Sequence, residues 1–125
     1  MLFGTTTMTQ STTTYSFGDV VLVAFPFTNL SARKKRPAVI ISNHDYHQNR
    51  PDVILMAITS RVKEPLFTGE SPLENWKDAG LPKISILKPL IATLEQKQIV
   101  SVLGKLSTTD RQKLIGVIQT ILGES

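Results

Sequence analysis

The sequence predicts a mainly β domain of the α+β class, in which a small curled sheet or barrel is closed by a C-terminal amphipathic helix. About five short runs rich in Val, Ile and Leu follow one another, separated by polar loops that contain Pro and Gly. Such runs are typical of strands joined in meander order. Helical spacing of apolar residues is found only near the C-terminus. At 125 residues, the chain has the length of one domain and can bury a hydrophobic core.

Residues 1–16 are rich in Thr and carry no charged side chain, so we expect a disordered tail there and a folded domain over 17–123. The chain contains no cysteine, which excludes disulfides and thiolate sites. No apolar run approaches the roughly 18 residues that span a bilayer. No basic segment followed by a long apolar stretch marks a secretory signal. We therefore expect a cytoplasmic protein without membrane contacts.

The expected strands are short apolar runs bounded by turn-forming residues. The first follows the turn at Gly18 and Asp19, and the second begins at Pro37, which is tolerated as a first strand residue because no ladder donor is needed there. Strands are expected at 20–25, 38–42, 53–60, 83–88 and 98–106, with a further short strand at 66–68. The segments 26–36, 43–52 and 61–82 are expected to be loops, the last with a helical turn that ends at Gly80.

The final element is expected to be an amphipathic helix that begins near residue 108. Ser107 or Thr108 can cap its N-terminus, and Asp110 is favourable in its first turn. Gly123 suits the position after the last helical residue. The residues expected on the apolar face are Leu114, Ile115, Ile118, Ile121 and Leu122.

Positive charge is concentrated in the run Arg33, Lys34, Lys35 and Arg36, whose four cations match the formal net charge of +4. Such a run is either a solvated loop or a contact site for an anion. Because Pro37 restricts the chain, we expect Arg36 to be held at the start of a strand. A guanidinium fixed in this way can bind phosphate through two hydrogen bonds.

The third expected strand ends in Thr59, Ser60 and Arg61, which offer two hydroxyls and a cation. If this strand neighbours the second one, Arg36 and Thr59 meet at one end of the sheet. A threonine at a strand end is also an ordinary structural feature, so both readings of Thr59 stay open.

Other kinds of site find little support in the sequence. The carboxylates are scattered, and the two histidines, His44 and His47, flank Asp45 in a polar loop. Two or three ligands on a polar loop are a weak pattern for a metal site, so we expect no metal and no cofactor. The chain has neither a glycine-rich phosphate loop nor a serine nucleophile motif.

Three motifs occur in order along the chain: "GDVVLVAFPF", "KRPAVIIS" and "LMAITS". A Gly-Asp turn opens the first strand, an Arg-Pro pair opens the second, and Ile-Thr-Ser ends the third. Together with the tail "LGKLS" and "VIQTIL", they resemble the MazF/PemK family, the toxins of bacterial toxin–antitoxin modules. The resemblance covers residues 17–122.

This resemblance implies an SH3-like β-barrel, a homodimer and a metal-independent endoribonuclease that cleaves single-stranded RNA, usually mRNA. It also implies an antitoxin partner whose acidic, flexible segment occupies the basic groove. The catalytic pair of the family maps onto Arg36 and Thr59. The residues expected to bind RNA around this pair are Arg33, Lys34, Lys35, Ser60 and Arg61.

The chain departs from the family pattern in two places. "TNLSARKK" carries no acid before the Arg-Pro pair, and "KPLIATLE" lacks the Arg or Asp-Gln that some relatives have there. His44 or His47 is a candidate auxiliary acid or base, although an ordinary role in a solvated loop is the alternative for both.

The alternatives to a nuclease are a noncatalytic nucleic-acid-binding module and a gyrase poison. The polar C-terminal residues, Gly123 to Ser125, do not suit a gyrase poison.

Overall fold

The computed structural model describes residues 14–24 and 34–124. Most of the predicted tail, the end of the first predicted strand and Arg33 lie outside these residues. Tyr15, which the sequence analysis places in the tail, is 8% exposed and packs in the core. The folded part of the chain therefore begins before residue 17.

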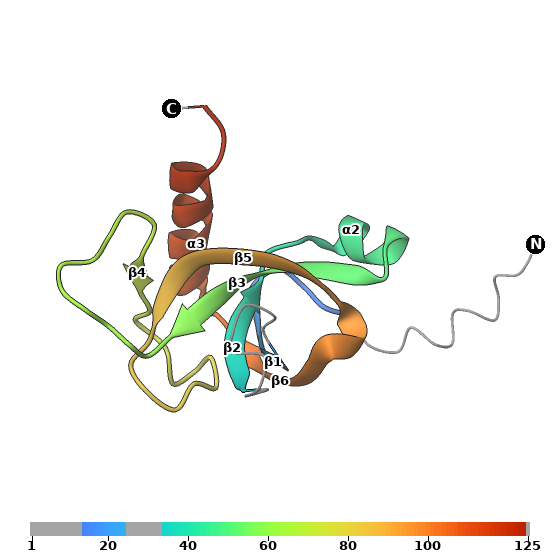
Figure 1. The fold of residues 1–125 in the computed structure, drawn as a ribbon, viewed down its shortest axis with the longest axis horizontal. Coiled ribbons are helices and arrows are strands. Elements are labelled where there is room, and N and C mark those ends of the chain that lie inside the picture. Colours follow the sequence, from blue (N-terminus) through green and yellow to red (C-terminus); the bar gives the residue numbers. More distant parts are fainter. Residues whose placement is uncertain (1–13, 25–33, 125) are drawn as a thin grey trace, which may run out of the picture.

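One sheet of six antiparallel strands forms the body of the domain, in the order β4-β5-β3-β2-β1-β6 (Figure 1). The strands are β1 (Asp19–Ala24), β2 (Lys35–Ile40), β3 (Asp52–Thr59), β4 (Ser71–Pro72), β5 (Ile86–Glu95) and β6 (Ile99–Lys105). The helical elements are α2 (His44–Asn49), the 3-10 turn η1 (Gln96–Gln98) and α3 (Thr108–Ile121).

This architecture confirms the predicted mainly β class with a C-terminal helix. Within the described ranges, β4 and β6 stand at the two ends of the strand order and do not pair with each other. Closure into an SH3-like barrel therefore stays a prediction. None of the helices in the described part of the chain is long and apolar enough to cross a membrane.

Five predicted strands are confirmed with shifted ends, and several local predictions are wrong. Two predicted loops contain strand residues, since β4 (Ser71–Pro72) lies within 61–82 and the first two residues of β2 lie within 26–36. The segment 66–68 is not a strand, because the backbone N–H of Glu70 turns back to the carbonyl of Phe67 at 3.0 Å. The segment 43–52 is not all loop, because Asn43 caps α2 by accepting a hydrogen bond from the N–H of Tyr46. The fourth strand also begins later and runs further than predicted.

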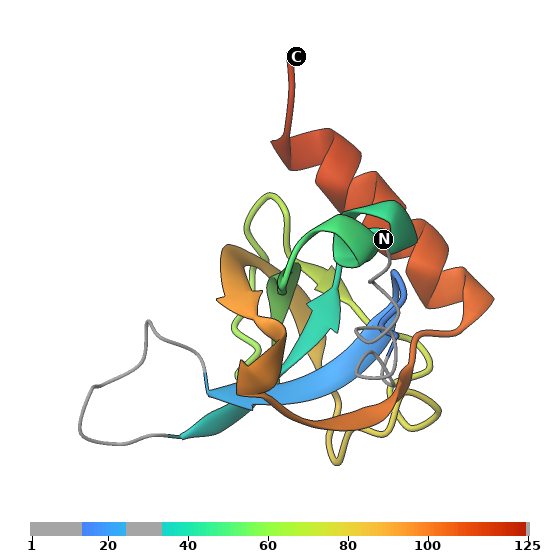
Figure 2. The ribbon, with the colours of Figure 1, turned by 90° about the vertical axis from the view of Figure 1, so that its right-hand side faces the viewer.

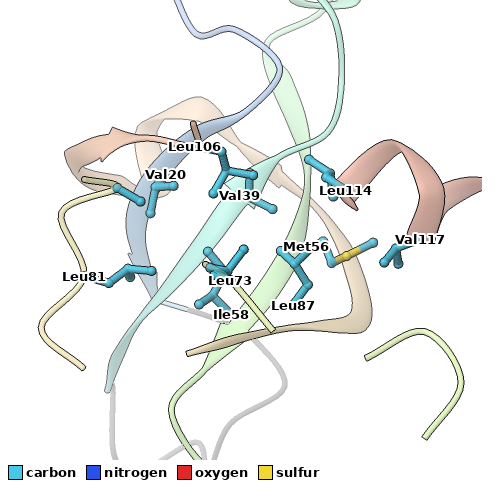
Figure 3. Close-up of a cluster of buried hydrophobic side chains, with 11 residues drawn as sticks. Val20, Val39, Met56, Ile58, Leu73, Leu81, Leu87, Leu106, Leu114 and Val117 are labelled. Atoms are coloured by element: carbon cyan, nitrogen blue, oxygen red, sulfur yellow. The ribbon is translucent and has the colours of Figure 1, made fainter. Parts of the chain in front are cut away.

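Alternating side chains of the central strands fill two separate hydrophobic clusters, one on each face of the sheet. The first cluster contains Tyr15, Val21, Val23, Ala38, Ile40, Val53, Leu55, Ala57, Ala92 and Leu94. The second cluster contains Val20, Val39, Met56, Ile58, Leu73, Ala79, Leu81, Leu87, Leu106, Leu114 and Val117. In the second cluster, Leu114 and Val117 of α3 lie beside Met56 of β3 (Figure 3). Helix α3 therefore packs on the face of the sheet opposite the first cluster (Figure 2).

The apolar face of α3 differs in part from the prediction. Leu122 is 53% exposed and is the C-cap, whereas Val117, which the prediction left out, is buried. Ser107 is the N-cap and Gly123 has a positive φ of 87°, as predicted. Asp110 is fully buried, because its carboxylate accepts hydrogen bonds from the backbone N–H groups of Glu74 (2.9 Å) and Asn75 (2.8 Å).

These contacts hold the segment 73–85, which connects β4 to β5, against α3 and β6. Its tight turn ends at Gly80, which has φ +82°. A Cβ on Gly80 would overlap the carbonyl oxygen of Leu103 in β6, and a Cβ on Gly104 would come within 2.8 Å of Ala79. The segment thus brings the β4–β5 side of the sheet close to β6, although no strand pairing joins them in the described residues.

Replacing Asp110 by Ala is expected to lower the free energy of unfolding by about 3 kcal/mol, because two backbone N–H groups then lose a charged acceptor. Urea denaturation followed by circular dichroism measures the change. Thr109→Ala, at an exposed position in the same turn, is the control and should change stability by less than about 0.5 kcal/mol. Equal losses in both variants would contradict the role given to the carboxylate.

Gly80→Ala is expected to destabilise the fold by at least about 2 kcal/mol, because it adds both left-handed strain and the overlap with β6. Gly116→Ala is a matched control on α3, where a Cβ meets nothing within 4 Å. The control should raise stability by about 0.5–1 kcal/mol, since Ala favours the helix. Thermal unfolding should show opposite shifts in Tm, and a neutral Gly80→Ala would refute the close approach.

Candidate functional site

A cavity of about 440 Å³ opens at one end of the sheet, between the start of β2 and the end of β3. The first half of β5 and the segment 81–85 complete its walls. A volume of this size is in the range of sites that bind small ligands. Its polar and charged lining residues are Arg36, Thr59, Ser60, Arg61, Lys83, Ser85 and Lys88.

The cavity exists because the pairing between β2 and β3 stops before the two strands end. The ladder runs from Ile40 paired with Leu55 to Ala38 paired with Ala57. Beyond it, residues 35–37 of β2 pair only with β1. Pro37 lacks an N–H group and cannot donate to a ladder, which suits a position where pairing is lost on one side. Pro37 therefore lies inside β2, and the prediction that it is the first residue of the strand is wrong.

The register of the two strands relates Arg36 to Thr59. Continuing the ladder two residues beyond Ala38 and Ala57 places Arg36 opposite Thr59. Because side chains alternate along a strand, both residues lie on the face that carries Ala38 and Ala57. Both are half-buried at the edge of the first cluster. The structure thus brings these two predicted residues to one cavity.

The hydroxyl of Thr59 is held in place by the chain that follows it. Its Oγ1 accepts a hydrogen bond from the backbone N–H of Arg61 at 3.0 Å. The hydroxyl proton is not used by this contact, so Thr59 can donate it to an acceptor in the cavity. A strand-end threonine anchored in this way is a fixed hydrogen-bond donor.

All charged side chains among the described residues that line the cavity are positive. Four cations, Arg36, Arg61, Lys83 and Lys88, line it, and no Asp or Glu is among the described lining residues. The ion pairs found in the described ranges are formed by other residues, such as Arg50 and Asp52 at 3.1 Å. There the hydrogen bond from Arg50 lowers the pKa of the Asp52 carboxyl. A cavity that gathers cations without acids is suited to an anionic ligand with several charges.

Lys34 and Lys35 lead into the site but do not line it. Both are exposed just before Arg36 in the chain. Arg33 lies outside the described residues. Ser60 and Arg61 line the cavity beside Thr59, as the sequence predicts for residues near the pair.

His44 and His47 lie elsewhere. They belong to α2, which follows the opposite end of β2 and lies beside the start of β3 (Figure 1). His47 is buried, with its Nδ1 2.8 Å from the carbonyl oxygen of Tyr15 and its Nε2 2.6 Å from the hydroxyl of Ser42. Neither histidine lines the cavity, so neither is assigned a chemical role there.

Sequence reasoning missed Lys83 and Lys88. They stand at the two ends of the predicted strand 83–88, and their spacing does not distinguish them from ordinary surface lysines. Only the packing of β5 and the segment 81–85 brings them to the cavity. Among residues 14–24 and 34–124, no group of three or more His, Cys, Asp or Glu side chains is arranged to hold a metal ion.

Most of the chain matches one known protein family. Residues 16–122 match the family described as PemK-like, MazF-like toxin of type II toxin-antitoxin system. A search of curated protein sequences finds no significant match.

Several solved structures have the same fold at low sequence identity. One is an endoribonuclease in complex with its cognate antitoxin from Mycobacterial species, 18% identical, with a TM-score of 0.71 over 88% of this chain and 96% of that chain. MazE–MazF from Deinococcus radiodurans is 19% identical, with a TM-score of 0.71 over 90% and 100%. The Mycobacterium tuberculosis toxin MazF-mt6 is 18% identical, with a TM-score of 0.63 over 80% and 91%.

Proposed function

The chain belongs to the PemK-like, MazF-like family of toxins of type II toxin–antitoxin systems, and from this premise we propose that it is a metal-independent endoribonuclease that cleaves single-stranded mRNA at specific sequences. The observation that carries the proposal is the cavity at the end of the sheet. It combines the half-buried residue Arg36 with the anchored hydroxyl of Thr59. RNA supplies the multiply charged anion that such a cavity suits.

The proposed reaction uses the RNA 2′-hydroxyl as nucleophile. The 2′-oxygen forms a bond to phosphorus and loses its proton, the bond to the 5′-oxygen breaks, and the departing oxygen gains a proton. Negative charge grows on the nonbridging oxygens of the phosphate along this path. Arg36 stabilises that charge, and Thr59 donates a hydrogen bond to one of the oxygens. The products are a 2′,3′-cyclic phosphate and a 5′-hydroxyl.

Other cations of the cavity and its approach, together with the hydroxyl of Ser60, would hold the RNA chain. Arg61 and Ser60 follow Thr59 directly, and Lys34 and Lys35 precede Arg36. Contacts of this kind with flanking phosphates are sensitive to salt. We also propose that the protein acts in the cytoplasm as a homodimer. An antitoxin with an acidic, flexible segment would compete with RNA for the same cations, since both carry repeated negative charge.

One observation favours a second candidate, a noncatalytic nucleic-acid-binding module. No His, Asp or Glu is among the described residues that line the cavity, so none of these side chains is placed to take the proton from the 2′-hydroxyl. A binding module would retain RNA in a gel-shift experiment over a range of salt and yield no cleavage product. A nuclease would yield products with the end groups given above.

Arg36→Ala is expected to reduce the rate of RNA cleavage by about 10²–10³-fold, because one fixed donor to the developing charge is lost. The measurement is incubation of the full chain with a defined single-stranded RNA in EDTA, followed by end-group mapping. Arg111→Ala, which removes an exposed cation from α3, is the control and should cleave at the normal rate. Full activity of Arg36→Ala would refute its role, and an inactive unmodified protein would refute the proposed function.

Thr59→Val is expected to lower kcat by about 10²-fold, because the side chain keeps its shape but loses the hydroxyl donor. Thr59→Ser keeps the hydroxyl and should stay within about 10-fold of the unmodified protein. Single-turnover cleavage at saturating RNA separates kcat from binding. If the Val and Ser variants were equally active, the hydroxyl would have no part in the reaction.

A further inference from the structure

Lys88 is a cation of the cavity that the proposed catalytic pair does not use. It is exposed, it lines the same cavity as Arg36 and Thr59, and it belongs to β5, on the far side of β3 from β2. Because β5 forms the longest ladder with β3, the backbone of Lys88 is held by strand pairing. Lys83, by contrast, precedes the strand and is not in register with Thr59.

The register of β3 and β5 fixes where Lys88 stands. Lys88 pairs with Ala57, so its side chain lies on the same face as Ala57 and Thr59. Lys88 and Thr59 are therefore diagonal neighbours, which places their Cα atoms roughly 7–8 Å apart. Arg36 faces Thr59 from the other side of β3. The three side chains lie on one face of three adjacent strands.

An irregularity in β5 makes Lys88 a diagonal neighbour of Thr59 instead of a direct one. The ladder shifts between Met56 and Ala57, so that Ile91 pairs with Met56 but Lys88, not Leu90, pairs with Ala57. Pro89 and Leu90 are left over in the bulge. Pro89 has no N–H to donate, and proline in a sheet is tolerated at such a bulge. In an unbroken ladder Lys88 would pair with Thr59, and the bulge moves it along the same face to Ala57.

We propose that Lys88 binds the RNA phosphate next to the scissile one. This inference rests on the proposed function and adds to it a binding residue on β5. A lysine displaced from Thr59 by one diagonal step is not opposite the scissile phosphate, which Arg36 and Thr59 hold. It lies where the neighbouring phosphate of a backbone that crosses β2, β3 and β5 would pass. Its ammonium has no ion-pair partner in the described part of the chain.

Binding to noncleavable RNA tests the proposal. The full chain is titrated with a fluorescein-labelled, 2′-O-methyl single-stranded RNA of mixed sequence at several salt concentrations, and binding is followed by fluorescence anisotropy. For single strands, each phosphate contact contributes about 0.7 to the slope of log K against log salt. Lys88→Gln should reduce the slope by about 0.7 and weaken binding roughly fivefold at about 0.1 M salt. Lys88→Arg should restore both.

Lys97→Gln is the matched control, because it removes one exposed lysine just beyond the opposite end of β5. It should leave the slope unchanged. In cleavage of unmodified RNA, Lys88→Gln should raise KM with little change in kcat, whereas Arg36→Ala should lower kcat. An unchanged slope for Lys88→Gln, or an equal decrease for Lys97→Gln, would overturn the proposal.

The same experiments separate this inference from the proposed function. If the protein cleaves RNA but Lys88→Gln keeps the normal slope, the Lys88 contact is refuted and the nuclease stands. If RNA binding depends on Lys88 but unmodified RNA is not cut, the phosphate contact stands and the nuclease is refuted. If the 2′-O-methyl RNA does not bind at all, the contact with RNA is refuted.

Discussion

The antiparallel pairing of β2 with β3, and the point at which it stops, is the constraint on which the rest of the structure depends. These two strands occupy the centre of the sheet, and their alternating side chains supply both hydrophobic clusters. The register that buries Ala38 and Ala57 also aligns Arg36 with Thr59. A slip of one residue would turn the side chains of a strand to the opposite face, so the packing of the core also fixes the site.

The remaining walls of the cavity depend on contacts far away in the sequence. Asp110 and the turn at Gly80 hold the segment 73–85 against α3 and β6. The last part of this segment, residues 81–85, lines the cavity together with the end of β3. The C-terminal helix thus has two roles, since it covers the second cluster and positions one wall of the site. Rigid support of this kind keeps a binding site in one geometry.

The concentration of positive charge in the cavity destabilises the folded state. Four cations are gathered within it, and none has a carboxylate partner among the described lining residues. Mutual repulsion of like charges opposes such a cluster in the absence of a ligand. An anion that binds there relieves the repulsion and so stabilises the fold by mass action. RNA phosphates and an acidic antitoxin segment, the two ligands proposed above, share this chemistry.

The sequence by itself determined the class of the fold, the main strands and the caps of the C-terminal helix, and it singled out Arg36 and Thr59 as candidates. These features depend on local composition, on turn and cap residues, and on short motifs, all of which are readable along the chain. Only the tertiary structure decided that His47 is a buried partner of Tyr15 and Ser42, and that Lys88 lies beside Thr59. Strand register, bulges and the packing of distant segments set those positions. They are contacts between residues far apart in the chain, for which local sequence carries no signal.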